Sequence, residues 1–271
     1  MTVTPAPLAC QNLHVRYDAV PVLHGLDLSL PAGRITVFVG SNGCGKSTLL
    51  KSFARLLAPD QGTVLLNGRD IAQQSSAQVA RALSMLPQSA TAPDGLTVHD
   101  LVRLGRYPHH NWLRQWSRED EAQVDAALHD TGLSALRDRP VDTLSGGQRQ
   151  RAWIAMTLAQ DAPVMLLDEP TTYLDLAHQI EVLDLIDRLN TERGKTVVMV
   201  LHDLNLAARY AHHMVALRDG AVVAAGAPSE VMDVALVKRV FDLDCQIIAD
   251  PLFGTPLCVP FGKGRRPPAS N

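Results

Sequence analysis

Short apolar runs at 35–39, 164–167 and 197–201 punctuate the chain, and longer amphipathic stretches separate them. Runs of aliphatic and β-branched residues without polar alternation are typical of strands that are buried on both faces of a parallel sheet. In α/β proteins such strands alternate with helices. The pattern therefore predicts an α/β fold with a mainly parallel sheet flanked by helices.

The clearest helical pattern spans residues 176–189. Apolar side chains recur there every three to four residues and share one helical face, namely Leu176, Ile180, Leu183, Ile186 and Leu189. Glu181, Asp184 and Arg188 fall on other faces. We expect this helix to pack its apolar stripe on the sheet.

Two further regions complete the predicted architecture. Residues 8–30 and 63–68 have strand patterns with tight turns, which indicates a small antiparallel section beside the core. Residues from about 90 to 160 lack strong strand patterns but offer helix starts at Thr97 and Ser117, so we expect a helical subdomain inserted in the core. Residues 1–261 then form one domain, and residues 262–271 form a disordered, solvated tail.

Composition narrows the function classes. No apolar run approaches the roughly 18 residues that cross a bilayer, and the N-terminus lacks the basic start of a secretory signal, so we expect a cytoplasmic protein. The four cysteines show no paired spacing and are expected to be free thiols. A net charge of −3 without a long basic block argues against nucleic acid as a partner.

A glycine-rich segment follows the first apolar run and precedes an apolar helical stretch; it is Gly40-Ser41-Asn42-Gly43-Cys44-Gly45-Lys46-Ser47-Thr48. Strand, loop and helix in this order are the context of a phosphate-binding P-loop. Gly43 and Gly45 let successive N–H groups point at a β-phosphate, and the helix adds its positive end. We expect Lys46 to span the β- and γ-phosphates, Ser47 to bind Mg²⁺ and Thr48 to bond a phosphate nearer the ribose.

The apolar run at 164–167 ends in two carboxylates, Asp168 and Glu169. A buried strand that delivers acidic residues at its end is typical of a metal–nucleotide site. We expect Asp168 to orient Mg²⁺ through water and Glu169 to act as the catalytic base toward the water that attacks the γ-phosphate. By itself such a strand end is roughly as often only a capped turn, but the preceding P-loop favours the catalytic interpretation.

Between these motifs lies Leu144-Ser145-Gly146-Gly147-Gln148. Ser145 is suited to cap a helix, and two glycines after it leave amides exposed to an anion. The pentapeptide resembles the signature motif of the ABC ATPases. The resemblance implies a P-loop NTPase core in an ABC cassette, and it implies that Ser145, Gly146, Gly147 and Gln148 bind the γ-phosphate of ATP held by the other subunit of a homodimer.

Further motifs of this family occur in the expected order between about residues 8 and 260. They imply that Tyr17 stacks on adenine, that Gln88 contacts Mg²⁺ or the attacking water, and that Asp175 lies across the dimer interface. They also imply that His202 bonds the γ-phosphate and supports Glu169. Without the family, Tyr17 and His202 would indicate packing, Asp175 a helix cap at roughly even odds, and Gln88 only a loop.

Segments 104–109, 171–179 and 201–210 resemble one branch of the family, the ATPases of ferric-siderophore, haem and cobalamin importers. Segment 247–257 also resembles the ferric-siderophore members. This likeness implies a Mg²⁺-dependent ATPase on the cytoplasmic face of the bacterial inner membrane. Its partners would be integral-membrane permease subunits and, indirectly, a periplasmic or lipoprotein binding protein.

Other functions stay open at this point. A cobalamin or haem importer ATPase belongs to the same branch, and an efflux ATPase shares the core motifs. Soluble ABC proteins of DNA repair or translation are disfavoured, because the chain has one cassette and a short interval between Lys46 and Asp168. A cassette that has lost catalysis is disfavoured because all the expected catalytic side chains are present.

Overall fold

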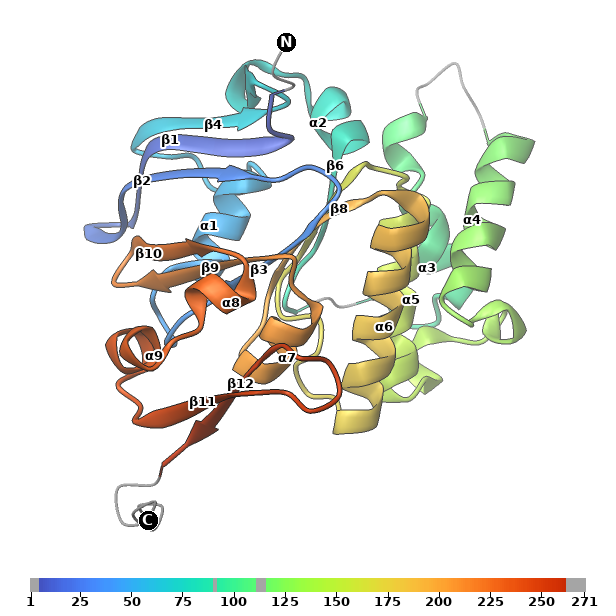
Figure 1. The fold of residues 1–271 in the computed structure, drawn as a ribbon. Helices are drawn as coiled ribbons and strands as arrows, with labels where there is room; N and C mark the ends of the chain where they lie inside the picture. Colours follow the sequence, from blue (N-terminus) through green and yellow to red (C-terminus); the bar gives the residue numbers. More distant parts are fainter. Residues whose placement is uncertain (1–4, 90–91, 111–115, 262–271) are drawn as a thin grey trace.

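The computed structural model describes residues 5–89, 92–110 and 116–261. Its central sheet has the strand order β10-β9-β3-β8-β7-β6 (Figure 1). These strands span Ile35–Val39 (β3), Leu83–Leu86 (β6), Val164–Leu167 (β7), Thr196–Val200 (β8), His213–Arg218 (β9) and Ala221–Gly226 (β10). Strands β6, β7, β8, β3 and β9 run parallel, and β10 joins β9 antiparallel at the edge. The predicted α/β fold with a mainly parallel sheet is confirmed.

A second, antiparallel sheet has the order β2-β1-β4-β5 and comprises β1 (Leu8–Tyr17), β2 (Val20–Leu30), β4 (Gln61–Leu66) and β5 (Arg69–Asp70). Helix α1 (Lys46–Phe53) lies between the two sheets (Figure 1). Leu49, Leu50 and Phe53 of this helix are fully buried, and Phe38 of β3 belongs to the same apolar cluster. The predicted antiparallel section is confirmed, and its packing fixes the helix that follows the glycine-rich loop.

The opposite face of the central sheet is covered by longer helices. Ile35, Val37 and Val39 of β3 alternate with Phe38 and join a cluster that includes residues of α5 (Gly146–Ala159) and α6 (Leu176–Arg193). This alternation is the two-residue period of a strand. The first apolar run is therefore buried on both faces, as its continuous pattern predicts.

Helix α6 confirms most of the stripe predicted for it. Leu183, Ile186 and Leu189 are buried and Ile180 is partly buried. The prediction for Leu176 is wrong, because this side chain is 68% exposed. Residues 175–177 are all exposed, so the first turn of the helix extends beyond the apolar core.

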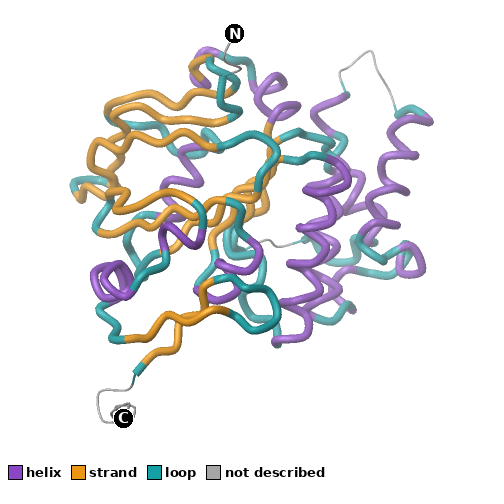
Figure 2. The backbone as a smooth tube through the Cα atoms, in the orientation of Figure 1, coloured by secondary structure: helices purple, strands orange, loops and turns teal. Residues whose placement is uncertain are grey.

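Helices α3 (Val98–Leu104), α4 (Arg118–Asp130) and α5 pack on one another at one side of the molecule (Figure 2). The side chains of Thr97, Ser117 and Ser145 each accept a backbone N–H from the first turn of the helix that follows, which confirms the predicted helix starts. Arg106, which follows α3, is buried. It donates to Asp120 Oδ1 at 3.0 Å and to the carbonyl of Ala159 at 2.8 Å.

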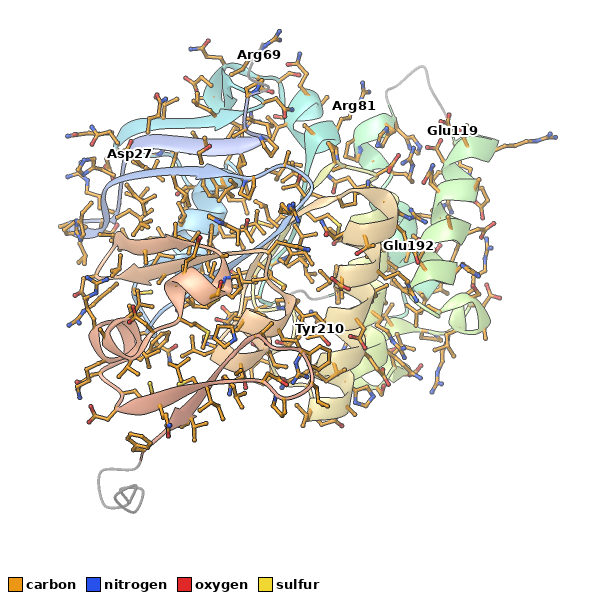
Figure 3. All side chains as sticks on the ribbon, in the orientation of Figure 1. Asp27, Arg69, Arg81, Glu119, Glu192 and Tyr210 are labelled. Atoms are coloured by element: carbon orange, nitrogen blue, oxygen red, sulfur yellow. The ribbon has the colours of Figure 1, made fainter. Side chains whose placement is uncertain are left out.

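The remaining elements surround this core. They are α2 (Ser76–Ala82), α7 (Leu204–Tyr210), α8 (Pro228–Val231), α9 (Val234–Phe241), the strands β11 (Cys245–Ala249) and β12 (Pro256–Pro260), and 3-10 turns at Ile71–Gln73, Tyr107–His109, Ser134–Leu136 and Val141–Thr143. Tyr210 lies at the end of α7 (Figure 3). Its hydroxyl donates to Asp184 of α6 at 2.6 Å.

Two sequence predictions concern the surface and the thiols. Within the described ranges, no helix is both long and apolar enough to cross a membrane. All four cysteines are free, as predicted, and the structure shows that they are also buried. The predicted tail at 262–271 lies outside the described residues.

Candidate functional site

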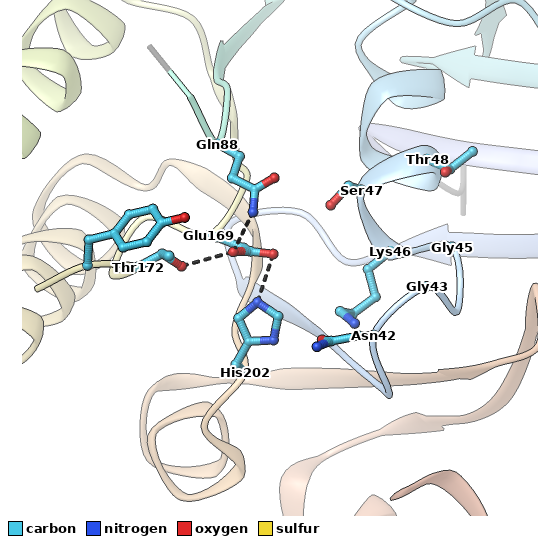
Figure 4. A pocket seen from close by; sticks show the side chains of 11 residues that line it. Asn42, Gly43, Gly45, Lys46, Ser47, Thr48, Gln88, Glu169, Thr172 and His202 are labelled. Carbon is cyan, nitrogen blue, oxygen red and sulfur yellow. Dashed lines mark hydrogen bonds and ion pairs between the residues drawn. The ribbon is translucent and has the colours of Figure 1, made fainter. Parts of the chain in front are cut away.

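Most of the predicted site residues meet at the carboxyl edge of the central sheet. The glycine-rich loop follows β3, Gln88 follows β6, Asp168 and Glu169 follow β7, and His202 follows β8. These four strands are parallel neighbours, so their carboxyl ends share one edge. A cavity of about 400 Å³ lies there (Figure 4). It is lined by Asn42, Gly43, Gly45, Lys46, Ser47, Thr48, Gln88, Glu169, Thr172, Tyr173 and His202.

The glycine-rich loop turns sharply into α1 at Gly45. This residue has φ of 103°, and an added Cβ would lie 2.7 Å from Leu23 Cδ2. Both its conformation and the close approach of Leu23 therefore require glycine. The turn leaves the N-terminus of α1 facing the cavity, where unpaired amides and the helix dipole favour an anion.

Lys46 is the first residue of α1 and carries a positive charge. Lys46 is 5% exposed, and its ammonium donates to the carbonyl oxygens of Gly40 and Ser41 at 2.8 and 2.9 Å. Its Nζ also lies 3.7 Å from the buried Cys44 sulfur. The loop thus encloses one positive charge at the floor of the cavity.

Ser47 connects this loop to the neighbouring strand. Its hydroxyl donates to Asp168 Oδ1 at 2.8 Å, while Asp168 Oδ2 is buried without a hydrogen-bond partner. Burial raises the pKa of Asp168 above its ordinary value, although the Ser47 hydrogen bond and the charge of Lys51 oppose this shift. An unpaired buried carboxylate oxygen beside a hydroxyl suits a hard divalent cation, which prefers oxygen ligands.

Glu169 is held by three side chains from three segments. Gln88 Nε2 donates to Oε2 at 2.8 Å, Thr172 Oγ1 donates to Oε2 at 2.9 Å, and His202 Nε2 lies 2.7 Å from Oε1 (Figure 4). The backbone of Glu169 has φ of 54°, in the left-handed region that is strained for this residue type. The carboxylate is therefore fixed at the point where the chain leaves β7.

The same contacts determine the charge of Glu169. Burial by itself would raise the pKa of this carboxyl group, but the hydrogen bonds from His202 and Thr172, the nearby His202 charge and the Gln88 amide outweigh it, so the pKa is lowered. Glu169 is consequently ionised at neutral pH. An ionised carboxylate held beside a phosphate site is able to orient and polarise a water molecule.

Ser145–Gln148 and Asp175 do not line this cavity, although Gly146 lines a second pocket that shares Gln88, Thr172 and Tyr173 with it. Ser145, Gly146 and Asp175 are exposed. The Ser145 hydroxyl accepts the Gln148 N–H at 3.3 Å, and Gln148 Oε1 accepts the Ser145 N–H at 3.1 Å. This capping box orders the start of α5. Asp175 is the N-cap of α6, and its side chain accepts the His178 N–H at 3.0 Å.

Tyr17 also lies outside the cavity lining, at the end of β1, and is 43% exposed. Conversely, the sequence did not point to Thr172 or Tyr173, which do line the cavity. Thr172 follows Glu169 by three residues in a turn whose Thr172 N–H donates to the Glu169 carbonyl at 3.2 Å. A hydroxyl residue at this spacing after a strand-end carboxylate is the signal that could have identified it.

A helix N-terminus behind a glycine-rich loop, an enclosed lysine, a serine–aspartate pair and a fixed glutamate define a P-loop nucleoside triphosphatase. The chain matches the model of the ABC transporter family over residues 23–172, more than half of its length. It therefore belongs to the ABC transporter family, as an ATP-binding subunit that hydrolyses ATP.

Individual relatives are similar along almost the whole chain. The achromobactin transport ATP-binding protein CbrD of Dickeya dadantii is 62% identical over 94% of this chain and 95% of its own length. The ferric enterobactin transport ATP-binding protein FepC of Escherichia coli is 50% identical over 97% of both. The structure resembles a subunit of a metal-chelate type ABC transporter in an inward-facing conformation, with a TM-score of 0.82, 30% identity, and coverage of 95% of this chain and 98% of that one.

Proposed function

We propose that this chain hydrolyses ATP to power the import of iron(III)–siderophore complexes across the bacterial inner membrane. The likeness to the ferric enterobactin transport protein over 97% of the chain carries this proposal. The contacts around Glu169 support the hydrolysis step, because three side chains hold this carboxylate beside the P-loop. A cobalamin or haem importer is the alternative within the same branch.

In the proposed site, the amides of residues 40–48 and the Lys46 ammonium bind the phosphates, and Tyr17 stacks on adenine. We assign the cation as Mg²⁺, held by Ser47, by Gln88 and, through water, by Asp168. Bound there, Mg²⁺ neutralises phosphate charge during transfer. The orphaned Oδ2 of Asp168 fits this assignment, since a hydrated cation would supply its missing partner.

Hydrolysis in this proposal depends on positioning and charge rather than covalent chemistry. The Glu169 carboxylate accepts a hydrogen bond from the attacking water as catalytic base. His202 lies 2.7 Å from Glu169, from where it supports the carboxylate and is able to hydrogen-bond the γ-phosphate. The buried charge of Lys46 stabilises the negative charge that builds up on the transferred phosphoryl group.

Two chains complete the site. Ser145 and Gly146 are exposed at the capped N-terminus of α5, and none of residues 145–148 lines the cavity of their own chain. We propose that these residues and Asp175 bind at the ATP of a second copy, so that a homodimer encloses two nucleotides. The dimer would sit on the cytoplasmic face of the membrane against permease subunits, with a periplasmic or lipoprotein binding protein as an indirect partner and no nucleic acid.

The test is uptake of radiolabelled ferric siderophore by source cells whose only copy carries Glu169→Gln. Labelled cobalamin serves as the parallel substrate. Glu192→Gln is the matched control, because Glu192 is an exposed glutamate near the end of α6 (Figure 3). We expect loss of ferric-siderophore uptake in the Glu169 variant and normal uptake of both substrates in the control.

Two results would contradict the proposal. Loss of cobalamin uptake alone would keep the importer branch and refute the iron chelate as substrate. Unchanged uptake of both labels would reject these two substrates and direct the search to haem, efflux or a role outside transport.

A further inference from the structure

His178 joins two segments that the sequence treats as separate motifs. It lies in the first turn of α6, three residues after Asp175, and its Nδ1 is 2.7 Å from Asp175 Oδ1. The backbone N–H of His178 donates to the same oxygen at 3.0 Å. Two hydrogen bonds from one residue therefore hold the Asp175 carboxylate, and they lower its pKa below the ordinary value.

The other side of the His178 ring lies against the start of α5. A Cβ added to Gly147 would be 2.4 Å from His178 Cδ2, 3.0 Å from Cγ and 3.2 Å from Nε2. Gly147 is buried and does not have a left-handed backbone, so its conformation alone does not demand glycine. What glycine supplies at this position is space for the imidazole ring.

Neighbouring residues also bring the start of α5 close to α6 and to the segment just before it. A Cβ on Gly146 would be in ordinary contact with Leu174 at 3.9 Å, and one turn farther along the helices Arg151 forms an ion pair with Glu181 at 3.6 Å. Of these contacts, the His178 ring makes the closest approach. It is also the contact that links Gly147 to Asp175, since the same His178 residue bonds the Asp175 carboxylate.

We propose that His178 is a positioning residue that fixes Asp175 relative to Ser145–Gln148 within one chain, so that both reach the nucleotide of the second copy as one unit. This role rests on the proposed function, because it concerns the face that a partner chain would contact. If Asp175 and Ser145–Gln148 already hold fixed relative positions in the single chain, less conformational entropy is lost when two chains close on ATP. His178 itself touches no nucleotide in this scheme.

Separate variants remove the two contacts of His178. His178→Asn keeps a donor at the position of Nδ1 but has no ring, His178→Phe keeps a ring over Gly147 without the hydrogen bond, and His178→Ala loses both. In a full-length Glu169→Gln background, dimerisation with ATP is measured by sedimentation and ATP affinity of the single chain by titration. We expect His178→Ala to weaken dimerisation roughly ten-fold, the scale of one hydrogen bond to a charged group, and to leave the single-chain ATP affinity unchanged.

Partial recovery of dimerisation in His178→Asn or His178→Phe would identify which contact matters. Dimerisation of His178→Ala equal to its parent would overturn the positioning role while leaving the proposed function intact. A parent chain that binds ATP but forms no dimer would overturn the two-chain site, and this role with it.

A double-mutant cycle tests the contact without nucleotide. Gly147→Ala should lower the thermal midpoint of the full chain, because the new Cβ displaces the ring from its place beside Asp175. The same substitution in a His178→Ala background should lower the midpoint much less, since the space is then available. Equal shifts in both backgrounds would show that the ring does not constrain Gly147, and would reject the link.

Discussion

The two faces that this protein would offer to nucleotide differ in how complete they are within one chain. At the carboxyl edge of the sheet, Ser47 is bonded to Asp168, and Glu169 has partners from three segments. At the start of α5, by contrast, Ser145 and Gly146 are exposed, and Ser145 bonds Gln148 within its own capping box. The first face is assembled by folding of one chain, whereas the second would be completed by another chain in the proposed scheme.

In the proposed scheme, this difference separates ATP binding from hydrolysis. Phosphate binding would need only the P-loop face of a single chain. Hydrolysis in the proposed scheme also needs the open face of a second chain. Substitutions on the two faces should therefore have different signatures, and the predictions that follow run from the largest expected effect to the smallest.

The largest effect is expected for Glu169→Gln. The substitution keeps the shape but removes the ionised carboxylate, so we expect hydrolysis to fall by roughly 10²- to 10⁴-fold, the usual range for a general base. ATP binding should persist, and dimers should accumulate with ATP. Steady-state phosphate release and sedimentation measure the two quantities, with Glu192→Gln as the control. Hydrolysis at the parental rate would remove Glu169 from the mechanism.

Ser145→Arg tests the open face. A long cationic side chain there should block approach of a second chain while the P-loop of the same chain stays intact. In the Glu169→Gln background we expect the ATP-dependent dimer to disappear and the single-chain ATP affinity to stay the same. Ser134→Arg, at another exposed serine, is the matched control. Weaker single-chain ATP binding would show instead that the two faces are not independent.

Arg106→Met tests what anchors the far end of α5, the helix that begins at the open face. The guanidinium bonds Asp120 and the carbonyl of Ala159 at the far end of α5, and Asp120 is fully buried. Removing one partner of a buried ion pair costs about 3–5 kcal/mol. Chemical denaturation should show this loss of stability, whereas the exposed Arg69→Met should show little. Equal stability of the two variants would mean that Arg106 does not anchor α5.

Acid should weaken the same support. Burial alone would raise the pKa of Asp120, but hydrogen bonds from Ser117 and Arg106 outweigh it and hold the pKa well below the ordinary 3.8. Because the folded value is lower than the unfolded one, the stabilisation is present above the unfolded pKa and is lost as the pH falls toward the folded pKa. As the pH is lowered from about 5 to about 2, the denaturation midpoint should fall less steeply in Asp120→Asn than in the parent chain. A slope equal to that of the parent would contradict this account.

The smallest effect is expected for Tyr17→Ala. Loss of one stacking ring is worth about 0.5–1.5 kcal/mol, which weakens ATP affinity by roughly two- to ten-fold. Tyr107→Ala removes another exposed tyrosine and should leave the affinity unchanged. Nucleotide titration of the single chain measures both. An unaltered affinity for Tyr17→Ala would place adenine elsewhere on the P-loop face.

The sequence by itself determined the elements and the local chemistry. Apolar runs predicted β3, β7 and β8, and the cap residues Thr97 and Ser117 predicted helix starts, because these signals depend on neighbours within a few residues. The order of glycine, lysine and serine after a strand also predicted the P-loop without tertiary information. The family resemblance extended this to Gln88 and His202.

Only the tertiary structure decided which side chains meet. Gln88, Glu169 and His202 are far apart in the chain, and the first and last both contact Glu169 because β6, β7 and β8 are adjacent and parallel. The apolar period could not reveal that Leu176 lies beyond the core, since a helical stripe does not show where the sheet beneath it ends. The contact of His178 with Gly147 likewise depends on how two helices pack, and packing distances are a property of the assembled fold rather than of either segment.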